Sequence, residues 1–331
     1  MKIYSEFKLA AIQAAPLFFD RKASTEKACR LIQEAGAQGA SIAAFSETWL
    51  PGYPFFIWGS STDSRLPWKA AADYLANAVE IPSPTTDQLC EAARKSKIDV
   101  VIGVVERDLH TKGTAYCTLL FIGSDGSILG RHRKLKPTHK ERAVWGEGDG
   151  ASLTVYERPY GRISGLNCWE HNMVLPGYVL MSQGTQIHIA AWPGSERKAP
   201  PAPNPIWARQ LLLSRAFASQ AASYVILAGG LLSAEDIPEA YQEFVSTQSG
   251  DSCIIDPRGE VIAGPAEGES ILIADASMEE IFAAKSACDV AGHYSRPDIF
   301  QLHVNRTPYH RVVEKQGPEY VAIEPDHAQK T

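Results

Sequence analysis

Long apolar runs and targeting signals are missing from this sequence. Its longest apolar stretch, around Tyr224 to Leu232, contains two glycines and is far shorter than the roughly 18 residues that a membrane-spanning helix needs. The first residues enter a strand-like run without the apolar core or the small-residue cleavage site of a signal peptide. We therefore expect a cytoplasmic protein with no membrane partner.

Blocks of positive charge and repeated segments are also missing. The 32 basic and 38 acidic side chains give a formal net charge of −6 and are spread along the 331 residues. Proteins that bind nucleic acid usually carry a basic patch, so we expect no nucleic acid partner. With 45% hydrophobic and 21% charged residues, the chain has the composition of a globular protein.

Cysteine and histidine are present, but not at the spacings of a structural metal site. The six cysteines are widely separated, and no CxxC or zinc-type Cys/His pair occurs. This pattern argues against a disulfide scaffold or a zinc site. We expect Cys29 and Cys117 to be small buried hydrophobic residues. The positions of His132, His139 and His171 fit surface loops, so we expect no catalytic histidine.

Predicted strands and helices alternate along the chain, and no linker divides them. Strands are expected at 8–15, 41–45, 98–105, 115–122, 127–133, 163–166, 187–191, 224–228 and 253–255, and helices from Ser24 and at 86–95, 179–183 and 206–222. The hairpin at 253–259 is expected to end the regular structure. The pattern predicts one α/β domain over residues 1–306, followed by a polar tail at 307–331.

Glu47, Lys134 and Cys168 each stand directly after a predicted strand. Ligands of open α/β sheets bind at the carboxyl ends of the strands. Each residue alone also has an ordinary explanation: a solvated loop glutamate, a basic surface cluster and an inert buried cysteine. A cysteine becomes a nucleophile only as a thiolate, which needs a nearby base or cation. A sharp turn from strand to helix would expose the Cys168 thiol at the sheet edge.

The segments around these three residues resemble the three catalytic blocks of the nitrilases, in the same order and with similar spacing. The blocks are FSETWLPGYP at 45–54, RKLKPT at 133–138 with ERAVWGEGDG at 141–150, and NCWEH at 167–171. IHIAAWPG at 187–194 and GHYSRPD at 292–298 resemble further stretches of the same branch. The resemblance covers roughly residues 5 to 305.

The resemblance implies the roles of the site residues. Cys168 would be the nucleophile, Glu47 the general base, Lys134 the electrostatic stabiliser, and Glu141 the second glutamate of the family. It also implies a four-layer αββα sandwich whose subunits pair so that the stack of sheets continues across a dimer. Such dimers often extend into larger oligomers or spirals.

Nitrile hydrolysis fits these residue types. A nitrile carbon is a poor electrophile, so attack needs a thiolate, a base for its proton and a cation near the nitrogen. The expected course runs through a thioimidate and a thioester to the carboxylic acid and ammonia. It needs neither a metal nor an organic cofactor. The backbone N–H of Trp169 is a candidate partner of Lys134 in holding the developing anion.

The substrate itself is less closely defined. Tyr53, Trp169, Trp192 and Pro193 are candidate substrate-binding residues, and the aromatic segment after Glu47 favours an aryl or arylalkyl nitrile over a short aliphatic one. After the nucleophile, relatives usually have Met-Pro-Leu, whereas Met-Val-Leu-Pro at 173–176 displaces the proline here. This departure concerns a stretch that commonly borders the substrate pocket.

Two alternative functions are compatible with the same residues. An amidase or a cyanide hydratase or dihydratase would use the same Glu, Lys and Cys set, although the blocks at 142–150 and 292–298 favour the nitrilase branch over amidases. An inactive assembly module could retain the fold. The presence of all three catalytic residue types argues against such a module.

Overall fold

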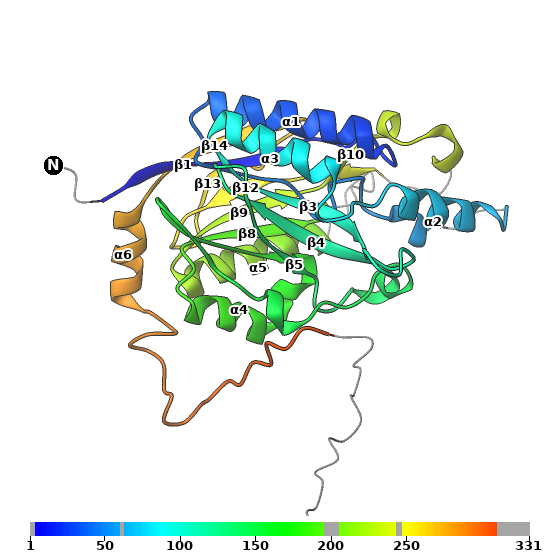
Figure 1. The fold of residues 1–331 in the computed structure, drawn as a ribbon. Helices are drawn as coiled ribbons and strands as arrows, with labels where there is room; N and C mark the ends of the chain where they lie inside the picture. Colours follow the sequence, from blue (N-terminus) through cyan, green and yellow to red (C-terminus); the bar gives the residue numbers. More distant parts are fainter. Residues whose placement is uncertain (1–3, 60–62, 195–204, 243–246, 310–331) are drawn as a thin grey trace, which may run out of the picture.

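The computed structural model describes residues 4–59, 63–194, 205–242 and 247–309. Two six-stranded sheets lie face to face, and helices cover the outer face of each sheet (Figure 1). This order of helix, sheet, sheet and helix confirms the α/β class and the four-layer αββα sandwich.

The first sheet contains the N-terminal strand at its second position. Its strand order is β14 (Ser270–Ser277), β1 (Glu6–Gln13), β2 (Ile42–Ala44), β3 (Asp99–Arg107), β4 (Ala115–Ile122) and β5 (Ile128–Arg133). The pairs β1–β2 and β2–β3 are parallel, and the others are antiparallel. Parallel pairs need long crossover connections. These contain α1 (Arg21–Ala37), α2 (Leu66–Ala76) and α3 (Pro84–Ser96).

The second sheet has three parallel strands at its centre. Its order is β13 (Val261–Ala263), β12 (Cys253–Ile255), β9 (Tyr224–Gly229), β8 (Ile187–Trp192), β7 (Gly161–Asn167) and β6 (Tyr156–Arg158). The parallel strands β7, β8 and β9 are connected through α4 (Val174–Ser182) and α5 (Pro205–Ala221), which cover the outer face of this sheet. The short strands β10 (Leu231–Leu232) and β11 (Gln248–Ser249) form a separate ladder.

The side chains of β1 show how the layers are held together. Leu9 and Ala11 point between the two sheets and belong to one apolar cluster with Ile189 of β8. Ala10 and Ile12 point to the other face and cluster with Ile32 of α1. Successive strand residues face opposite sides. The two faces of β1 are therefore both apolar, as expected for a sheet that is covered on both sides.

The regular structure continues beyond the hairpin at 253–259, so the expected end there is wrong. β14 pairs antiparallel with β1 from Glu6↔Ser277 to Gln13↔Ser270, and α6 (Met278–Ala287) follows it. Most residues of β14 are partly exposed at the edge of the sheet, which weakens the hydrophobic alternation in its sequence. α2 lies in a stretch for which the sequence pattern predicts no helix.

The C-terminal segment contacts the body of the protein without forming a helix or strand over residues 301–309. Arg306 Nη1 donates to the carbonyl of Leu153 at 2.6 Å, and the N–H of Tyr309 donates to Asp149 Oδ2 at 3.0 Å. Residues 310–331 of the expected tail lie outside the described residues. Among the helices of the described ranges, none has the length and apolarity to cross a bilayer.

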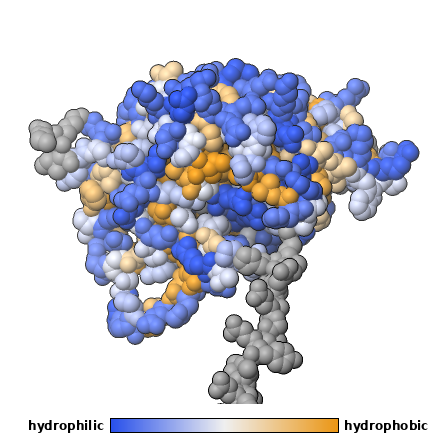
Figure 2. Space-filling view, viewed as in Figure 1, coloured by the Kyte–Doolittle hydropathy of each residue, from blue (hydrophilic) through white to orange (hydrophobic). Residues whose placement is uncertain are grey.

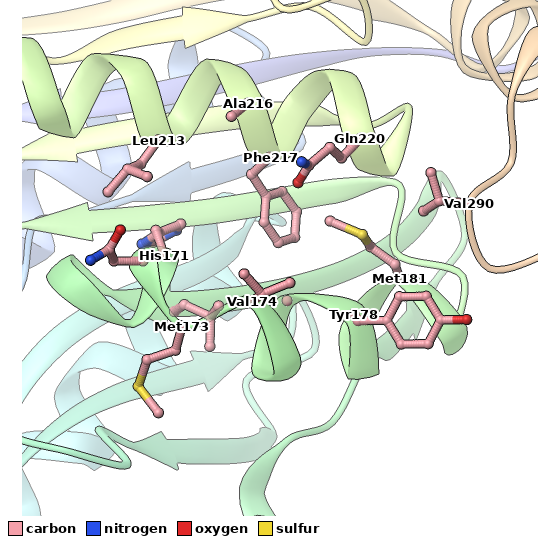
Figure 3. A pocket seen from close by; sticks show the side chains of 13 residues that line it. His171, Met173, Val174, Tyr178, Met181, Leu213, Ala216, Phe217, Gln220 and Val290 are labelled. Atoms are coloured by element: carbon pink, nitrogen blue, oxygen red, sulfur yellow. The ribbon is translucent and has the colours of Figure 1, made fainter. Parts of the chain in front are cut away.

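The outer faces of the two helical layers differ. Hydrophilic residues predominate over α1 and α3 at the top of the space-filling view (Figure 2). These two helices, which the structure describes in full, expose no large hydrophobic side chain. The layer of α4 and α5 instead exposes Val174, Leu175 and Leu212. Between α4 and α5 lies a groove of about 340 Å³, which Met181 and Phe217 help to line (Figure 3).

Gly103 of β3 allows the segment around Glu47 to lie directly on the sheet. A Cβ atom at this position would lie 2.1 Å from the carbonyl oxygen of Ser46 and 2.4 Å from the nitrogen of Thr48. The N–H of Leu50 donates to the Gly103 carbonyl at 3.1 Å. The backbone on both sides of Glu47 is therefore fixed against β3.

We expect Gly103→Ala to destabilise the protein by about 1 to 3 kcal/mol, because the new methyl group must displace backbone rather than a flexible side chain. The melting temperature should fall by several degrees, and the specific activity should fall with it as Glu47 moves. Gly113→Ala is the matched control, because the nearest atom to its Cβ, the Thr111 carbonyl oxygen, lies 3.8 Å away. A wild-type melting curve for Gly103→Ala would show that the close approach is not needed.

Candidate active site

The ends of three strands bring the predicted catalytic residues together. Glu47 follows β2, Lys134 follows β5, and Cys168 follows β7, while Glu141 lies on the 3-10 helix His139–Ala143. None of these four residues is more than 3% exposed. The first sheet supplies Glu47 and Lys134, and the second sheet supplies Cys168.

The ammonium group of Lys134 lies between the two glutamates. Its Nζ donates to Glu47 Oε1 and to Glu141 Oε2, each at 2.7 Å. Glu141 also accepts from the Tyr53 hydroxyl at 2.5 Å and from the backbone N–H of Thr138 at 2.6 Å. Buried charges need partners of opposite charge and further hydrogen bonds. The ammonium and the carboxylates satisfy this need, and the group carries one net negative charge when both glutamates are ionised.

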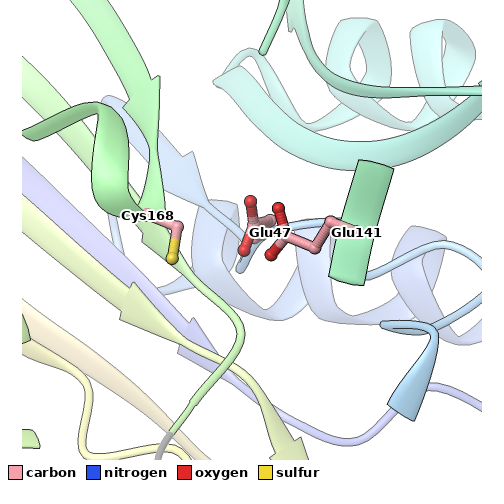
Figure 4. A group of neighbouring side chains, drawn as sticks. All are labelled: Glu47, Glu141 and Cys168. Carbon is pink, nitrogen blue, oxygen red and sulfur yellow. The ribbon is translucent and has the colours of Figure 1, made fainter. Parts of the chain in front are cut away.

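Cys168 lies beside the two carboxylates (Figure 4). Its sulfur and one oxygen each of Glu47 and Glu141 all lie within 4.8 Å of one another. The second oxygen of Glu47, Oε2, is buried and has no hydrogen-bond partner among the residues that the structure describes. Glu47 is thus bound to Lys134 through one oxygen and keeps a second oxygen available to accept a proton.

Burial sets the protonation state of the nucleophile and the base. Burial raises the pKa of the Cys168 thiol well above its ordinary value, and the carboxylate of Glu47 raises it further, against the pull of Lys134 and the Trp169 N–H. Burial also raises the pKa of Glu47 to about 7, again against Lys134. The resting thiol is therefore neutral, and the base titrates near neutral pH, where general-base catalysis works best.

Lys134 remains charged in this setting. Burial, the largest single effect, lowers the pKa of its ammonium, but the nearby acidic groups, Glu47 first and then Cys168 and Glu141, together outweigh burial and raise that pKa well above the ordinary value. Glu47, Glu141 and Cys168 place three potential metal-ligand atoms within 4.8 Å of one another. Lys134 already supplies the cation at this place, since its Nζ contacts both carboxylates.

Cys168 occupies a strained turn between β7 and the 3-10 helix Cys168–Asn172. Its φ is +50°, in the left-handed region that a non-glycine residue rarely adopts. The predicted sharp turn from strand to helix is confirmed. The predicted exposure of the thiol is wrong, because Cys168 is only 3% exposed and clusters with Trp192 and Phe217 beneath the helical layer.

Cys117 is a member of the site that the sequence reasoning overlooked. It is fully buried, as expected, but it is more than a small hydrophobic residue. Its thiol donates to Glu47 Oε1 at 3.3 Å, and its carbonyl accepts the backbone N–H of Lys134 at 2.8 Å. Its position on β4, next to β5, is the signal that could have placed it beside Lys134. Cys29, by contrast, is only partly buried.

The four candidate substrate residues lie in different surroundings. Tyr53 and Pro193 line a narrow cleft that also reaches Glu47. The indole of Trp192 is fully buried and donates to Ser214 Oγ at 3.2 Å, while its carbonyl accepts the Glu47 N–H at 3.4 Å. The N–H of Trp169 hydrogen-bonds to the Cys168 sulfur. The guanidinium of Arg209 lies 5.2 Å from the centre of the Trp169 ring.

Two of the three histidines do not fit the surface-loop interpretation. His132 is 2% exposed, and its Nε2 contacts both oxygens of the buried Glu170. The ring of His171 is partly buried, with Nδ1 at 2.7 Å from the Cys168 carbonyl and Nε2 at 3.0 Å from His188. His139 is exposed, as expected. The structure gives none of the three a contact with the Cys168 sulfur.

Cysteine-dependent hydrolases use a buried thiol beside a carboxylate base and an ammonium group, and this αββα sandwich brings these three groups together. Residues 8–286 match the family model described as carbon-nitrogen hydrolase, and the chain belongs to this family. Within it, the chain groups with the nitrilases. Nitrilase 2 from an unknown prokaryotic organism is 52% identical over 317 residues, which are 95% of this chain and 97% of that protein.

A more distant relative and two solved structures agree with this placement. An aliphatic nitrilase of Rhodococcus rhodochrous is 38% identical over 91% of this chain and 83% of that protein. The structure of Saccharomyces cerevisiae Nit3 matches with a TM-score of 0.67 and 20% identity over 89% of this chain and 98% of that one. The C. elegans NitFhit structure matches with a TM-score of 0.69 and 18% identity over 92% of this chain and 69% of that one. The two structures support the fold.

The raised pKa of Glu47, about 7, predicts how activity depends on pH. Below this pKa Glu47 is protonated and cannot accept the proton of the thiol, so kcat/KM should rise as pH increases through about 7 and then level off. The measurement is kcat/KM for a nitrile without ionising groups between about pH 5 and about pH 9. Circular dichroism over the same range controls for unfolding. A flat profile down to about pH 5 would contradict the assignment of Glu47 as the base.

Proposed function

We propose that this protein is a nitrile aminohydrolase, which converts an organic nitrile and two waters to a carboxylic acid and ammonia. The observation that carries the proposal is the free Oε2 of Glu47 in the same buried site as the Cys168 thiol and the Lys134 ammonium. The named relatives support it, because their sequences extend along nearly the whole chain.

The geometry supports a covalent route. Glu47 Oε2 accepts the proton of Cys168, and the sulfur attacks the nitrile carbon while Lys134 stabilises the negative charge on nitrogen. The nitrogen takes up the proton to give a thioimidate. Water then adds, and the tetrahedral intermediate expels ammonia, which receives its proton from a carboxyl group of Glu47 or Glu141. A second water hydrolyses the resulting thioester and releases the acid and the thiol.

Amide formation shares the first half of this route. If the tetrahedral intermediate expels the Cys168 sulfur instead of ammonia, the product is the amide, and a lupin relative carries the name bifunctional nitrilase/nitrile hydratase. Amides and cyanide therefore belong in any substrate panel. An inactive assembly module has no use for the buried charges of Glu47, Lys134 and Glu141, which are costly to bury without a function.

We further propose that aryl or arylalkyl nitriles are preferred over short aliphatic ones. The cleft beside Glu47 is lined by the aromatic side chains of Trp49, Tyr53 and Phe55. Phe56 has another role, because it packs against Phe19 with ring centres 5.9 Å apart. The cleft has a volume of only about 10 Å³, so it must widen to admit a ring. Burying the ring against these walls would then stabilise the complex by about 25 cal/mol per Å² of apolar surface.

In a panel of mandelonitrile, phenylacetonitrile and propionitrile, the first two should show the higher kcat/KM. Ammonia release and acid formation are measured together under one set of conditions, with propionamide and cyanide as further substrates. Cys168→Ala is the blank, since it removes the nucleophile with little change in volume. Hydrolysis by folded Cys168→Ala would rule out the covalent route. A clear preference for propionitrile would show that the aromatic residues do not bind the substrate side chain.

We also propose that the protein self-associates through the layer of α4 and α5, so that the stack of sheets continues in a second copy. The side chains of Val174, Leu175 and Leu212 are 79%, 61% and 64% exposed there. Large hydrophobic side chains that gather on one face usually mark an interface. The polar face of α1 and α3 offers no comparable surface.

All six cysteines are free thiols, which fits the reducing cytoplasm that we propose as the location of the protein.

Leu175→Glu should reduce the size of the assembly, because a carboxylate at this face is costly to bury in an interface. Sedimentation velocity of the wild type should give a dimer or a larger particle, and the variant should shift toward the monomer. Gln88→Glu, at an exposed position of α3, adds the same charge on the opposite layer and should leave the assembly unchanged. A monomeric wild type would refute the proposed interface.

A further inference from the structure

A further buried carboxylate, Glu170, lies beside the catalytic groups but does not belong to them. It is 1% exposed, and its oxygens accept hydrogen bonds from three directions. Oε1 accepts the backbone N–H of Leu135 at 2.8 Å, and Oε2 accepts the backbone N–H of Asn167 at 2.8 Å. The Nε2 of His132 lies 3.1 Å from both oxygens.

The two backbone donors are the direct neighbours of two catalytic residues. Leu135 follows Lys134, at the end of a strand of the first sheet, and Asn167 precedes Cys168, at the end of a strand of the second sheet. One carboxylate therefore binds both strand ends, each through its own oxygen. The Nδ1 of the His132 ring lies 3.2 Å from Ser152 Oγ, which fixes the orientation of the ring.

The bond to Asn167 also closes the turn that contains Cys168. With a φ of +50°, Cys168 needs surrounding contacts that offset the cost of its left-handed conformation. The loop from Asn167 to Glu170 supplies such a contact through the side chain of Glu170. Without it, the turn can relax, and the sulfur can then move away from Glu47.

Glu170 is suited to holding the two strand ends because its carboxyl group stays ionised. Burial alone would raise the pKa of the Glu170 carboxyl, but His132 and the two backbone donors outweigh burial and hold it below the ordinary value. Only a carboxylate offers two accepting oxygens of this kind. A glutamine side chain at this position would keep one accepting oxygen and would turn its NH2 donor toward a backbone N–H, which is also a donor.

We propose that Glu170, held by His132, is a positioning residue that sets the separation between the Cys168 sulfur and the Lys134 ammonium across the two sheets. It has no role in binding the nitrile. Its loss should act on the chemical steps and leave substrate binding nearly unchanged. The inference rests on the proposed function, which the wild-type activity and the Cys168→Ala blank test separately.

The test is Glu170→Gln, measured as kcat and KM for the best nitrile of the panel at a temperature at which the variant is folded. Displacements of about 1 Å in an active site can reduce rates by about a hundredfold. We expect kcat to fall by about 10-fold to 100-fold and KM to change by less than about threefold. The rate at which iodoacetamide alkylates Cys168, followed by mass spectrometry of its peptide, should also fall.

Asp99→Asn is the matched control. Asp99 is an equally buried carboxylate that accepts from the Ser124 N–H at 2.6 Å, Arg158 at 2.8 Å and the Tyr160 hydroxyl at 2.6 Å, and it lies in no contact with the catalytic groups. This variant should lose stability and keep its kcat. An equal fall of kcat in Asp99→Asn would show that any weakened core slows the enzyme, and would overturn the proposal.

Changes at His132 give a second test, which remains decisive if Glu170→Gln does not fold. His132→Ala removes the donor to Glu170 and should lower kcat, whereas His132→Gln retains an N–H donor at a similar distance and should recover most of it. A loss confined to KM in Glu170→Gln would make Glu170 a substrate-binding residue. That result would overturn the proposal. A kcat of Glu170→Gln within about twofold of the wild type would also overturn it, and so would a failure of His132→Gln to recover kcat.

Discussion

The chemistry of this protein depends on a positive charge that is kept away from water. The Lys134 ammonium has no exposed surface and contacts two carboxylates at 2.7 Å. Such a group is stable only with partners in a fixed geometry, and both glutamates are held by further elements. The backbone around Glu47 packs against β3, where Gly103 permits the close approach. Glu141 accepts hydrogen bonds from the Tyr53 hydroxyl and the Thr138 N–H. The same dry surroundings make Glu47 basic enough to take a proton near neutral pH.

The catalytic groups come from different sheets, so the contact between the sheets determines their distance. Glu47 and Lys134 belong to the first sheet and Cys168 to the second. The core between them combines small and branched side chains, such as Ala11 and Ile189, with aromatic ones such as Phe121, and it is closely packed. Sheet packing in this fold therefore has a direct role in catalysis.

Sequence patterns predicted the central strands well because these strands are buried on both faces and read as apolar runs. The ends of β2, β5 and β7 were predicted closely enough to place Glu47, Lys134 and Cys168 at one site. β14 and α6 were not predicted, since an edge strand and a surface helix carry little hydrophobic signal. The four layers and the residue roles came from the resemblance to the nitrilases rather than from periodicity.

Contacts between distant segments could not be predicted from local patterns. Cys117 and Glu47 are 70 residues apart, and Glu170 and Leu135 are 35 residues apart. Their hydrogen bonds arise only after the two sheets have come together. The burial of the Cys168 thiol also arises from tertiary structure, because α4 and α5, which lie outside the sequence block around Cys168, cover its turn.

The pairing of β1 with β14 has a consequence for the synthesis of the chain. β1 is synthesised long before β14 (Ser270–Ser277), which is one of its two neighbours in the sheet. Until then one edge of β1 has unpaired backbone groups, and contacts this distant in sequence form slowly. The first sheet is therefore completed only after β14 has been made, and until then the nascent protein exposes a strand edge that chaperones or other chains can bind.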